Sequence, residues 1–144
     1  MPHPTPSELK KTLQARGFEI YRTTADELVL AERVRDNLMM DSAVAARFSG
    51  GQLAVRLVIR AQSADFPGES PDGLFGRARK LAESAILRGF RETGTKVVPI
   101  RDPGDRTRTL DTWYEVWFEH PVSDEAELES ELRIALSLEK SARS

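Results

Sequence analysis

Histidine is the first residue type to inspect for acid–base catalysis or metal binding, and this sequence contains only two of them. His3 lies between prolines near the first residue, and His120 directly precedes Pro121. Neither has a second histidine at ligand spacing, and the chain has no cysteine. Because transition-metal sites are built from such clusters, we predict no metal site and no other cofactor.

Carboxylates, serines and glycines give no catalytic pattern either. Asp102, Asp105 and Asp111 lie in one polar segment, but this segment lacks the regular acidic spacing and the closing glutamate of a calcium-binding loop. Residues 49–51, Ser-Gly-Gly, lie between two alternating segments and predict a hairpin turn rather than a nucleophile elbow. The glycines form neither of the two common phosphate-binding patterns. We therefore predict no catalytic residue and a protein that is not an enzyme.

Arginines on two predicted strands offer one kind of binding site. Arg56 and Arg60 lie on the same face of an alternating segment, and Arg101 ends another. Guanidinium groups bind carboxylates and phosphates through paired hydrogen bonds, so these three are candidate anion ligands in an arginine-lined cavity. The structural alternative is that Arg56 and Arg60 pair across strands with glutamates such as Glu32.

The two tryptophans offer a second kind of site. Alternation through residues 112–120 places Trp113 and Trp117 on one face of a strand and the other aromatic residues on the opposite face. One face must be core, and the other either lies under a helix or contacts a partner. Together with Arg106 and Arg108 in the preceding segment, Trp113 and Trp117 are the candidate partner-binding residues.

Three helices are expected around these segments. Their expected N-terminal caps are Thr5, then Ser70 or Asp72, and finally Ser123. The first helix should end at Gly17, since glycine favours the left-handed conformation that closes helices. The second should run to about Arg91, ending near Gly89 or Gly94, and the third should end at Lys140.

The strands are predicted from period-two alternation. They cover residues 19–23, 27–34, 53–62, 95–101 and 112–120. Residues 35–48 suit either a strand or a helix, and extended structure is favoured. Residues 102–111 are expected to form a long loop, and Pro121 to end the last strand. The predicted class is α+β, an antiparallel sheet of five to six strands with three helices in the order α-β-β-(β)-β-α-β-β-α.

Length and composition set the remaining limits. A chain of 144 residues is the size of a single domain, and residues 1–4 and 141–144 are expected to fray. No apolar stretch is long enough to span a membrane, and the N-terminus does not have the pattern of a signal peptide. The absence of cysteine predicts a cytoplasmic protein. A net charge of -2 argues against a dedicated nucleic-acid binder.

The order of these elements resembles the small secretion-chaperone fold of type III secretion chaperones and YbjN-like proteins. The likeness is topological and covers residues 7–16, 19–62, 72–91, 95–120 and 123–140. Residues 35–48 and the arginine-rich segment depart from the compact form of that fold. The resemblance implies a homodimer whose antiparallel sheet binds an extended stretch of partner polypeptide, and it carries over no site residues.

The sequence is therefore compatible with two functions. The first is a non-enzymatic interaction module, chaperone-like or adaptor-like, that binds a partner polypeptide through its sheet surface. The second is a regulatory domain, or an enzyme without a recognisable motif, that binds a small ligand or anion in an arginine-lined cavity.

Overall fold

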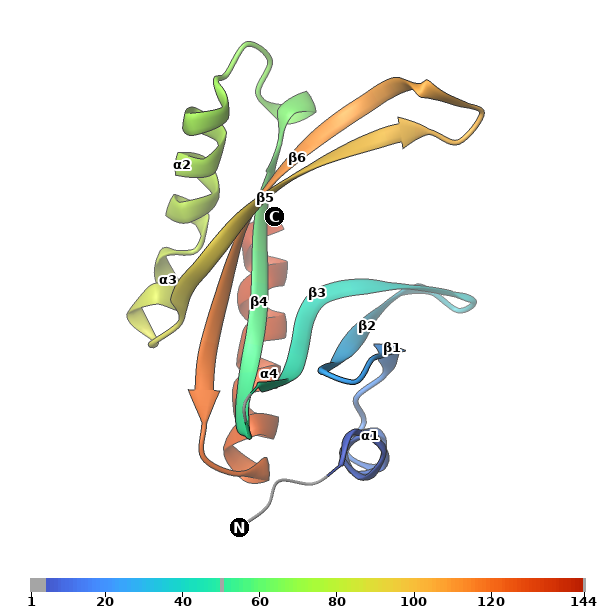
Figure 1. The fold of residues 1–144 in the computed structure, drawn as a ribbon, viewed down its shortest axis with the longest axis vertical. Coiled ribbons are helices and arrows are strands. Elements are labelled where there is room, and N and C mark those ends of the chain that lie inside the picture. The colour runs from blue at the N-terminus through green and yellow to red at the C-terminus, as the bar shows by residue number, and fades with distance from the viewer. Residues whose placement is uncertain (1–4, 50, 144) are drawn as a thin grey trace. The chain divides into compact units, whose positions relative to one another are not determined.

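The chain forms two compact units. The computed structural model describes residues 5–49 and 51–143. Within these residues a six-stranded antiparallel sheet, in the order β1-β2-β3-β4-β6-β5, is combined with four α-helices, which confirms the α+β class (Figure 1). Contacts divide the chain into unit 1, residues 1–57 and 119–144, and unit 2, residues 58–118. Strands β4 (Gln52–Gln62) and β6 (Asp105–Val122) contribute residues to both units.

Some sequence predictions fall outside the described residues. These are the fraying of residues 1–4 and of Ser144, the environment of His3, and part of the turn at residues 49–51. No helix within residues 5–49 and 51–143 is long and apolar enough to cross a membrane.

Helix α1 (Pro6–Ala15) begins and ends in unit 1 where its sequence predicts. The Thr5 hydroxyl accepts a hydrogen bond from the backbone N–H of the third helical residue at 3.2 Å. Gly17 adopts a φ of 92°, and the backbone N–H of Phe18 donates to the Leu13 carbonyl at 3.0 Å. This closure turns the chain so that Phe18 is buried beside the helix it follows.

Three strands of unit 1 follow helix α1. They are β1 (Ile20–Thr23), β2 (Glu27–Arg35) and β3 (Leu38–Ser49), and each pairs antiparallel with the next. The predicted hairpin and the extended interpretation of residues 35–48 are thus both confirmed. Strand β3 then pairs antiparallel with β4.

A bulge interrupts the pairing of β3 with β2. Between the pairs Val29–Ala45 and Ala31–Asp41, β3 has three residues where β2 has one. Ala43, inside the bulge, has a φ of 67° and is buried, and its backbone N–H donates to the Asp41 carboxylate at 2.7 Å. A left-handed backbone destabilises a non-glycine residue by about 1–2 kcal/mol. The bulge bends β3 (Figure 1) and stores strain at Ala43.

Ala43→Gly should leave the free energy of unfolding within about 1 kcal/mol of the wild type. Relief of the strain offsets the lost methyl burial and the added chain entropy, about 0.5–1 kcal/mol each. Ala45→Gly is the matched control, since Ala45 is buried in the same strand without a positive φ, and it should cost about 1–2 kcal/mol. Urea denaturation followed by circular dichroism measures both. Equal losses would show that Ala43 is not strained.

Helix α4 (Glu125–Arg143) completes unit 1 and packs against β3. Its N-terminal cap is Asp124, whose carboxylate accepts a hydrogen bond from the backbone N–H of Glu127 at 2.8 Å. The predicted cap, Ser123, is therefore one residue too early, because its own backbone N–H donates to the Glu127 carboxylate instead. The helix also continues three residues past the end expected at Lys140.

In unit 2 the expected second helix is two helices. Ser70 caps α2 (Pro71–Leu81), and a break at Ala82 separates it from α3 (Glu83–Leu87). Gly89, with a φ of 106°, closes α3, and the backbone N–H of the buried Phe90 donates to the Ala85 carbonyl. Of the two expected ends, Gly89 is therefore confirmed, and the helix stops short of Arg91 because this closure leads directly into a strand.

The long loop expected before the last strand is a tight turn. Strand β5 (Arg91–Asp102) joins β6 through Pro103 and Gly104. The Asp102 carboxylate accepts a hydrogen bond from the Gly104 N–H at 2.8 Å, and the Asp105 carboxylate accepts two from Thr107. The polar residues that predicted a loop therefore stabilise a hairpin. Strand β6 also continues past its expected end, through Val122.

Candidate functional site

Both tryptophans lie half-buried on β6 in unit 2, and each is held by a carboxylate two residues earlier. The indole N–H of Trp113 donates to Asp111 at 3.2 Å, and that of Trp117 donates to Glu115 at 3.2 Å. Residues two apart on a strand share a face. The sequence therefore places both indoles on one side of the strand, and the carboxylates fix their orientation.

Two cations lie over these indoles. The guanidinium carbon of Arg60, on β4, lies 4.2 Å from the centre of the Trp113 ring, and the Lys96 ammonium lies 6.0 Å from the centre of the Trp117 ring. The Nε of Arg60 is also 3.8 Å from the Glu115 carboxylate. We call the surface formed by Arg60, Lys96, Glu115 and the two tryptophans the tryptophan face.

The opposite side of β6 is core. Tyr114 packs edge-on against Phe75 of α2, with ring centres 5.3 Å apart and planes at 84°. Val116 and Phe118, on the same side as Tyr114, have no exposed surface. Of the two sides of β6, it is therefore the tyrosine side that helix α2 covers, and the tryptophan side stays partly exposed.

Asp111 ties this surface to the short 3-10 helix η1 (Ser63–Asp65). Its carboxylate accepts hydrogen bonds from the Ser63 hydroxyl, the Ala64 N–H and the Thr112 N–H, at 2.9, 2.9 and 2.7 Å. Burial alone would raise the pKa of Asp111, but these bonds and the Trp113 bond together lower it. Asp111 therefore remains ionised and anchors the Trp113 indole.

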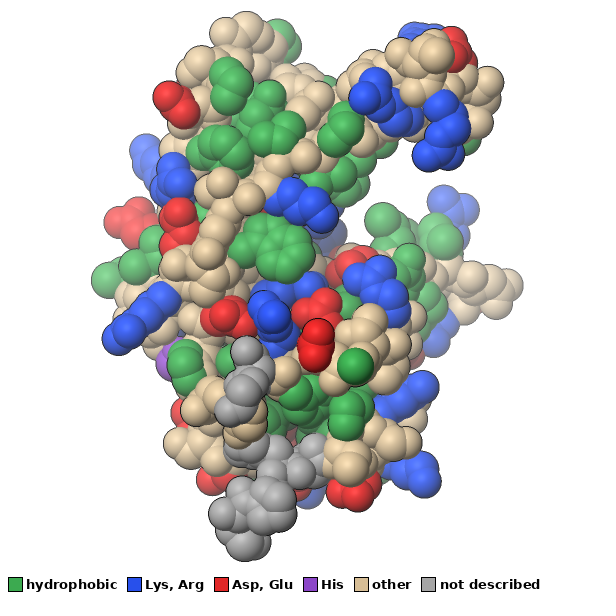
Figure 2. Space-filling model, in the orientation of Figure 1, with side chains coloured by type: hydrophobic (Ala, Val, Ile, Leu, Met, Phe, Trp, Pro, Cys, Tyr) green, Lys and Arg blue, Asp and Glu red, His purple; other side chains and the backbone are tan. Residues whose placement is uncertain are grey.

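The arginines of the β5–β6 hairpin are exposed at its tip, where basic side chains gather (Figure 2). They are Arg101, Arg106 and Arg108. Arg101 donates to the Thr109 hydroxyl at 2.6 Å, and Arg108 lies 4.0 Å from Asp102. Arg108 precedes Trp113 by five positions, roughly 17 Å along an extended strand. The candidate partner-binding residues thus form two groups along the β5–β6 hairpin, which we call the ribbon. One group is the two tryptophans, and the other is the arginines at the hairpin tip.

Arg56, predicted as an anion ligand, is instead buried and bonded to a carboxylate of the chain. It is 4% exposed in unit 1, and its Nη1 donates to both carboxylate oxygens of Glu27, at 2.9 and 3.1 Å. The expected partner Glu32 pairs instead with Arg143 at 2.8 Å. The cause is the strand register, because Ala45 pairs with Arg56 and its small side chain lets the arginine extend across β3 towards β2.

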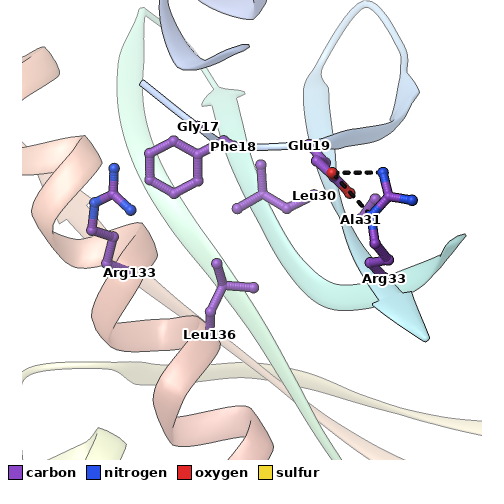
Figure 3. A pocket seen from close by; sticks show the side chains of 8 residues that line it. All are labelled: Gly17, Phe18, Glu19, Leu30, Ala31, Arg33, Arg133 and Leu136. Carbon is purple, nitrogen blue, oxygen red and sulfur yellow. Dashed lines mark hydrogen bonds and ion pairs between the residues drawn. The ribbon is translucent and has the colours of Figure 1, made fainter. Parts of the chain in front are cut away.

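An arginine-lined pocket does occur in unit 1, although none of the predicted arginines lines it (Figure 3). Its volume is about 330 Å³, and its lining residues are Gly17, Phe18, Glu19, Leu30, Ala31, Arg33, Arg133 and Leu136. Figure 3 shows the two arginines at opposite sides, with Phe18, Leu30 and Leu136 between them. Arg133 lies over the Phe18 ring at 4.4 Å. No spacing in the sequence signals this pocket, because its residues come from distant segments.

Both pocket arginines already serve the fold. Arg33 pairs with Glu19 at 2.8 Å and donates to the Asp36 carbonyl at 2.6 Å. Arg133 donates to the Arg16 carbonyl at 2.8 Å, which secures the end of helix α1. An anion entering the pocket would have to compete with these partners.

The described ranges, 5–49 and 51–143, contain no group of three histidine, aspartate or glutamate residues that could hold a metal ion. The strongest candidate site is the tryptophan face of unit 2, because it joins Arg60, predicted for an anion, to the two tryptophans predicted for a partner. Comparison with known proteins adds no assignment, since no family model, no curated protein and no solved structure matches this chain.

Proposed function

We propose that the protein is a non-enzymatic interaction module that binds an extended segment of a partner polypeptide on the tryptophan face. The observation that carries this proposal is the pair of half-buried indoles on one side of β6. Hydrogen bonds from Trp113 to Asp111 and from Trp117 to Glu115 hold both rings before any partner arrives. Binding would therefore order few side chains, which favours affinity.

The chemistry of this surface suits protein recognition. Tryptophan and arginine are the residue types most enriched among those that dominate binding energy at interfaces. Here Arg60 stacks on Trp113, which gives one flat surface with both apolar and charged parts.

The spacing of the indoles suits an extended chain. Trp113 and Trp117 are four residues apart on a strand, or roughly 13 Å. Side chains four residues apart in a bound extended segment repeat at the same interval. A segment lying along β6 would therefore place one side chain on each indole without a deep pocket.

The alternative function, small-anion binding by a regulatory domain, is supported by the pocket between Arg33 and Arg133 in unit 1. It ranks second because each of these arginines is already bonded within the fold.

The double variant Trp113→Ala/Trp117→Ala should lose at least about 90% of the partner protein that the wild type captures from a lysate of the source cells, measured by quantitative mass spectrometry. The loss follows from removing both large contact surfaces at the centre of the interface. Leu87→Ala is the control, because Leu87 is an 83% exposed apolar side chain on α3, a different element of unit 2. Circular dichroism should show that both variants are folded. Full capture by the double variant would remove the basis of the proposal.

A further inference from the structure

Arg60 presents hydrogen-bond donors on the tryptophan face. Its contacts there are the stack on Trp113 and the 3.8 Å ion pair with Glu115, which is longer than a hydrogen bond. A guanidinium carries five N–H donors in one plane, and stacking uses its face rather than these donors. Arg60 is therefore oriented by its surroundings while its donors suit an incoming carboxylate.

The carboxylates of the same ribbon are engaged within the chain. Asp102, Asp105, Asp111 and Glu115 accept hydrogen bonds from backbone or side-chain groups nearby. Glu92 accepts hydrogen bonds from Arg79, and Glu119 forms an ion pair with Arg47. Hydrogen bonds from Thr107 lower the pKa of Asp105, so it remains an ionised acceptor at neutral pH. Among the charged residues from 96 to 108, the four basic ones and Asp105 are exposed, so the charge offered to a partner there is mainly positive.

The hairpin end of the ribbon is basic although the chain is acidic. Between residues 96 and 108 there are four basic residues and two acidic ones, a local net charge of +2, against -2 for the whole chain. The basic residues are Lys96, Arg101, Arg106 and Arg108, and all four are exposed. A local field of this sign attracts acidic partners and speeds their encounter.

We infer that the bound segment is acidic, an extended stretch whose carboxylates are bound by Arg60 and the hairpin-tip arginines while its apolar side chains lie on the tryptophans. From Trp117 to Arg106 is eleven residues of one strand, or roughly 36 Å, so a segment of about 10–12 residues spans both groups. This inference rests on the proposed function and names the class of partner.

A display library of random 12-residue peptides, selected in parallel against the wild type and Trp113→Ala/Trp117→Ala, tests it. Peptides enriched on the wild type alone should be acidic, with apolar residues between the carboxylates. The affinity of one enriched peptide can then be measured by tryptophan fluorescence, since the chain has only two tryptophans and both lie on this face.

Charge variants identify which basic residues bind the peptide. Arg106→Gln/Arg108→Gln should lower the affinity for that peptide about 5–10-fold at low salt, and should make the affinity less dependent on salt. Arg60→Met should weaken it by a similar factor. Lys10→Gln/Lys11→Gln, on α1, makes the same change in net charge and should leave the affinity unchanged.

The outcomes separate the inference from the proposed function. Wild-type-specific peptides without acidic bias would overturn the inference and leave the proposed function standing. No enrichment over the tryptophan variant would overturn both. Displacement of the peptide by a 12-nucleotide oligo(dT) of higher affinity would overturn the inference and identify a nucleic-acid surface.

Discussion

Replacing Glu27 by alanine should lower the free energy of unfolding by about 3–5 kcal/mol. The side chains of Arg56 and Glu27 are only 5% and 17% exposed, and one guanidinium nitrogen bonds both carboxylate oxygens. Removing the carboxylate takes away the charge that neutralises a buried guanidinium, and such losses are large because the remaining ion stays out of water. Urea denaturation of the two proteins at neutral pH measures the difference.

An exposed pair in the same unit provides the control. Glu19 and Arg33 lie 2.8 Å apart, but their side chains are 40% and 50% exposed, so Glu19→Ala should cost less than about 1 kcal/mol. The double variant Glu27→Leu/Arg56→Met should recover most of the loss, since an apolar pair needs no neutralisation. If Glu27→Ala and Glu19→Ala lowered the free energy of unfolding by the same small amount, burial would not increase the contribution of the Glu27–Arg56 pair to stability.

The parts of this fold that sequence predicts are those encoded within a few residues. The caps at Thr5 and Ser70 and the left-handed closure at Gly17 each need only one turn of chain, and all three are present. Alternation likewise placed Trp113 and Trp117 on one side of a strand. Local chemistry decides these features, so distant segments do not change them.

Two of the errors share a cause, which is that strand pairing overrides local preference. Asp102, Pro103 and Gly104 have loop composition, yet antiparallel pairing carries β5 and β6 through to a turn of minimal length. The partner of Arg56 depended on strand register and on the small size of Ala45 between the strands. A single sequence predicts neither the short β5–β6 turn nor the partner of Arg56 unless the neighbouring strands are known.

The candidate site shows the same division. Alternation predicts that the tryptophans share a face, but the stack of Arg60 on Trp113 joins strands β4 and β6, which are far apart in sequence. Arg60, predicted as an anion ligand, and the tryptophans, predicted to bind a partner, therefore lie on one surface.

Asp111→Ala should lower the free energy of unfolding by about 2–4 kcal/mol and loosen the tryptophan face. Its carboxylate accepts hydrogen bonds from Ser63, Ala64, Thr112 and Trp113, and each bond to a charged group contributes about 1.5–3 kcal/mol without adding fully. The emission of Trp113 should shift to longer wavelength as its indole is released to water. Asp65→Ala, an exposed change in the neighbouring helix η1, should alter neither property.

The pH dependence of stability gives an independent check on Asp111. Because folding lowers the pKa of this carboxyl below its usual value of 3.8, its ionised form is favoured in the folded state. The stability it contributes is full above the unfolded pKa and is lost as pH falls below about 4 through the folded pKa. Asp111→Asn should therefore flatten the acid limb of the stability curve relative to the wild type. An unchanged acid limb, with unchanged Trp113 emission, would mean that this carboxylate does not anchor the tryptophan face.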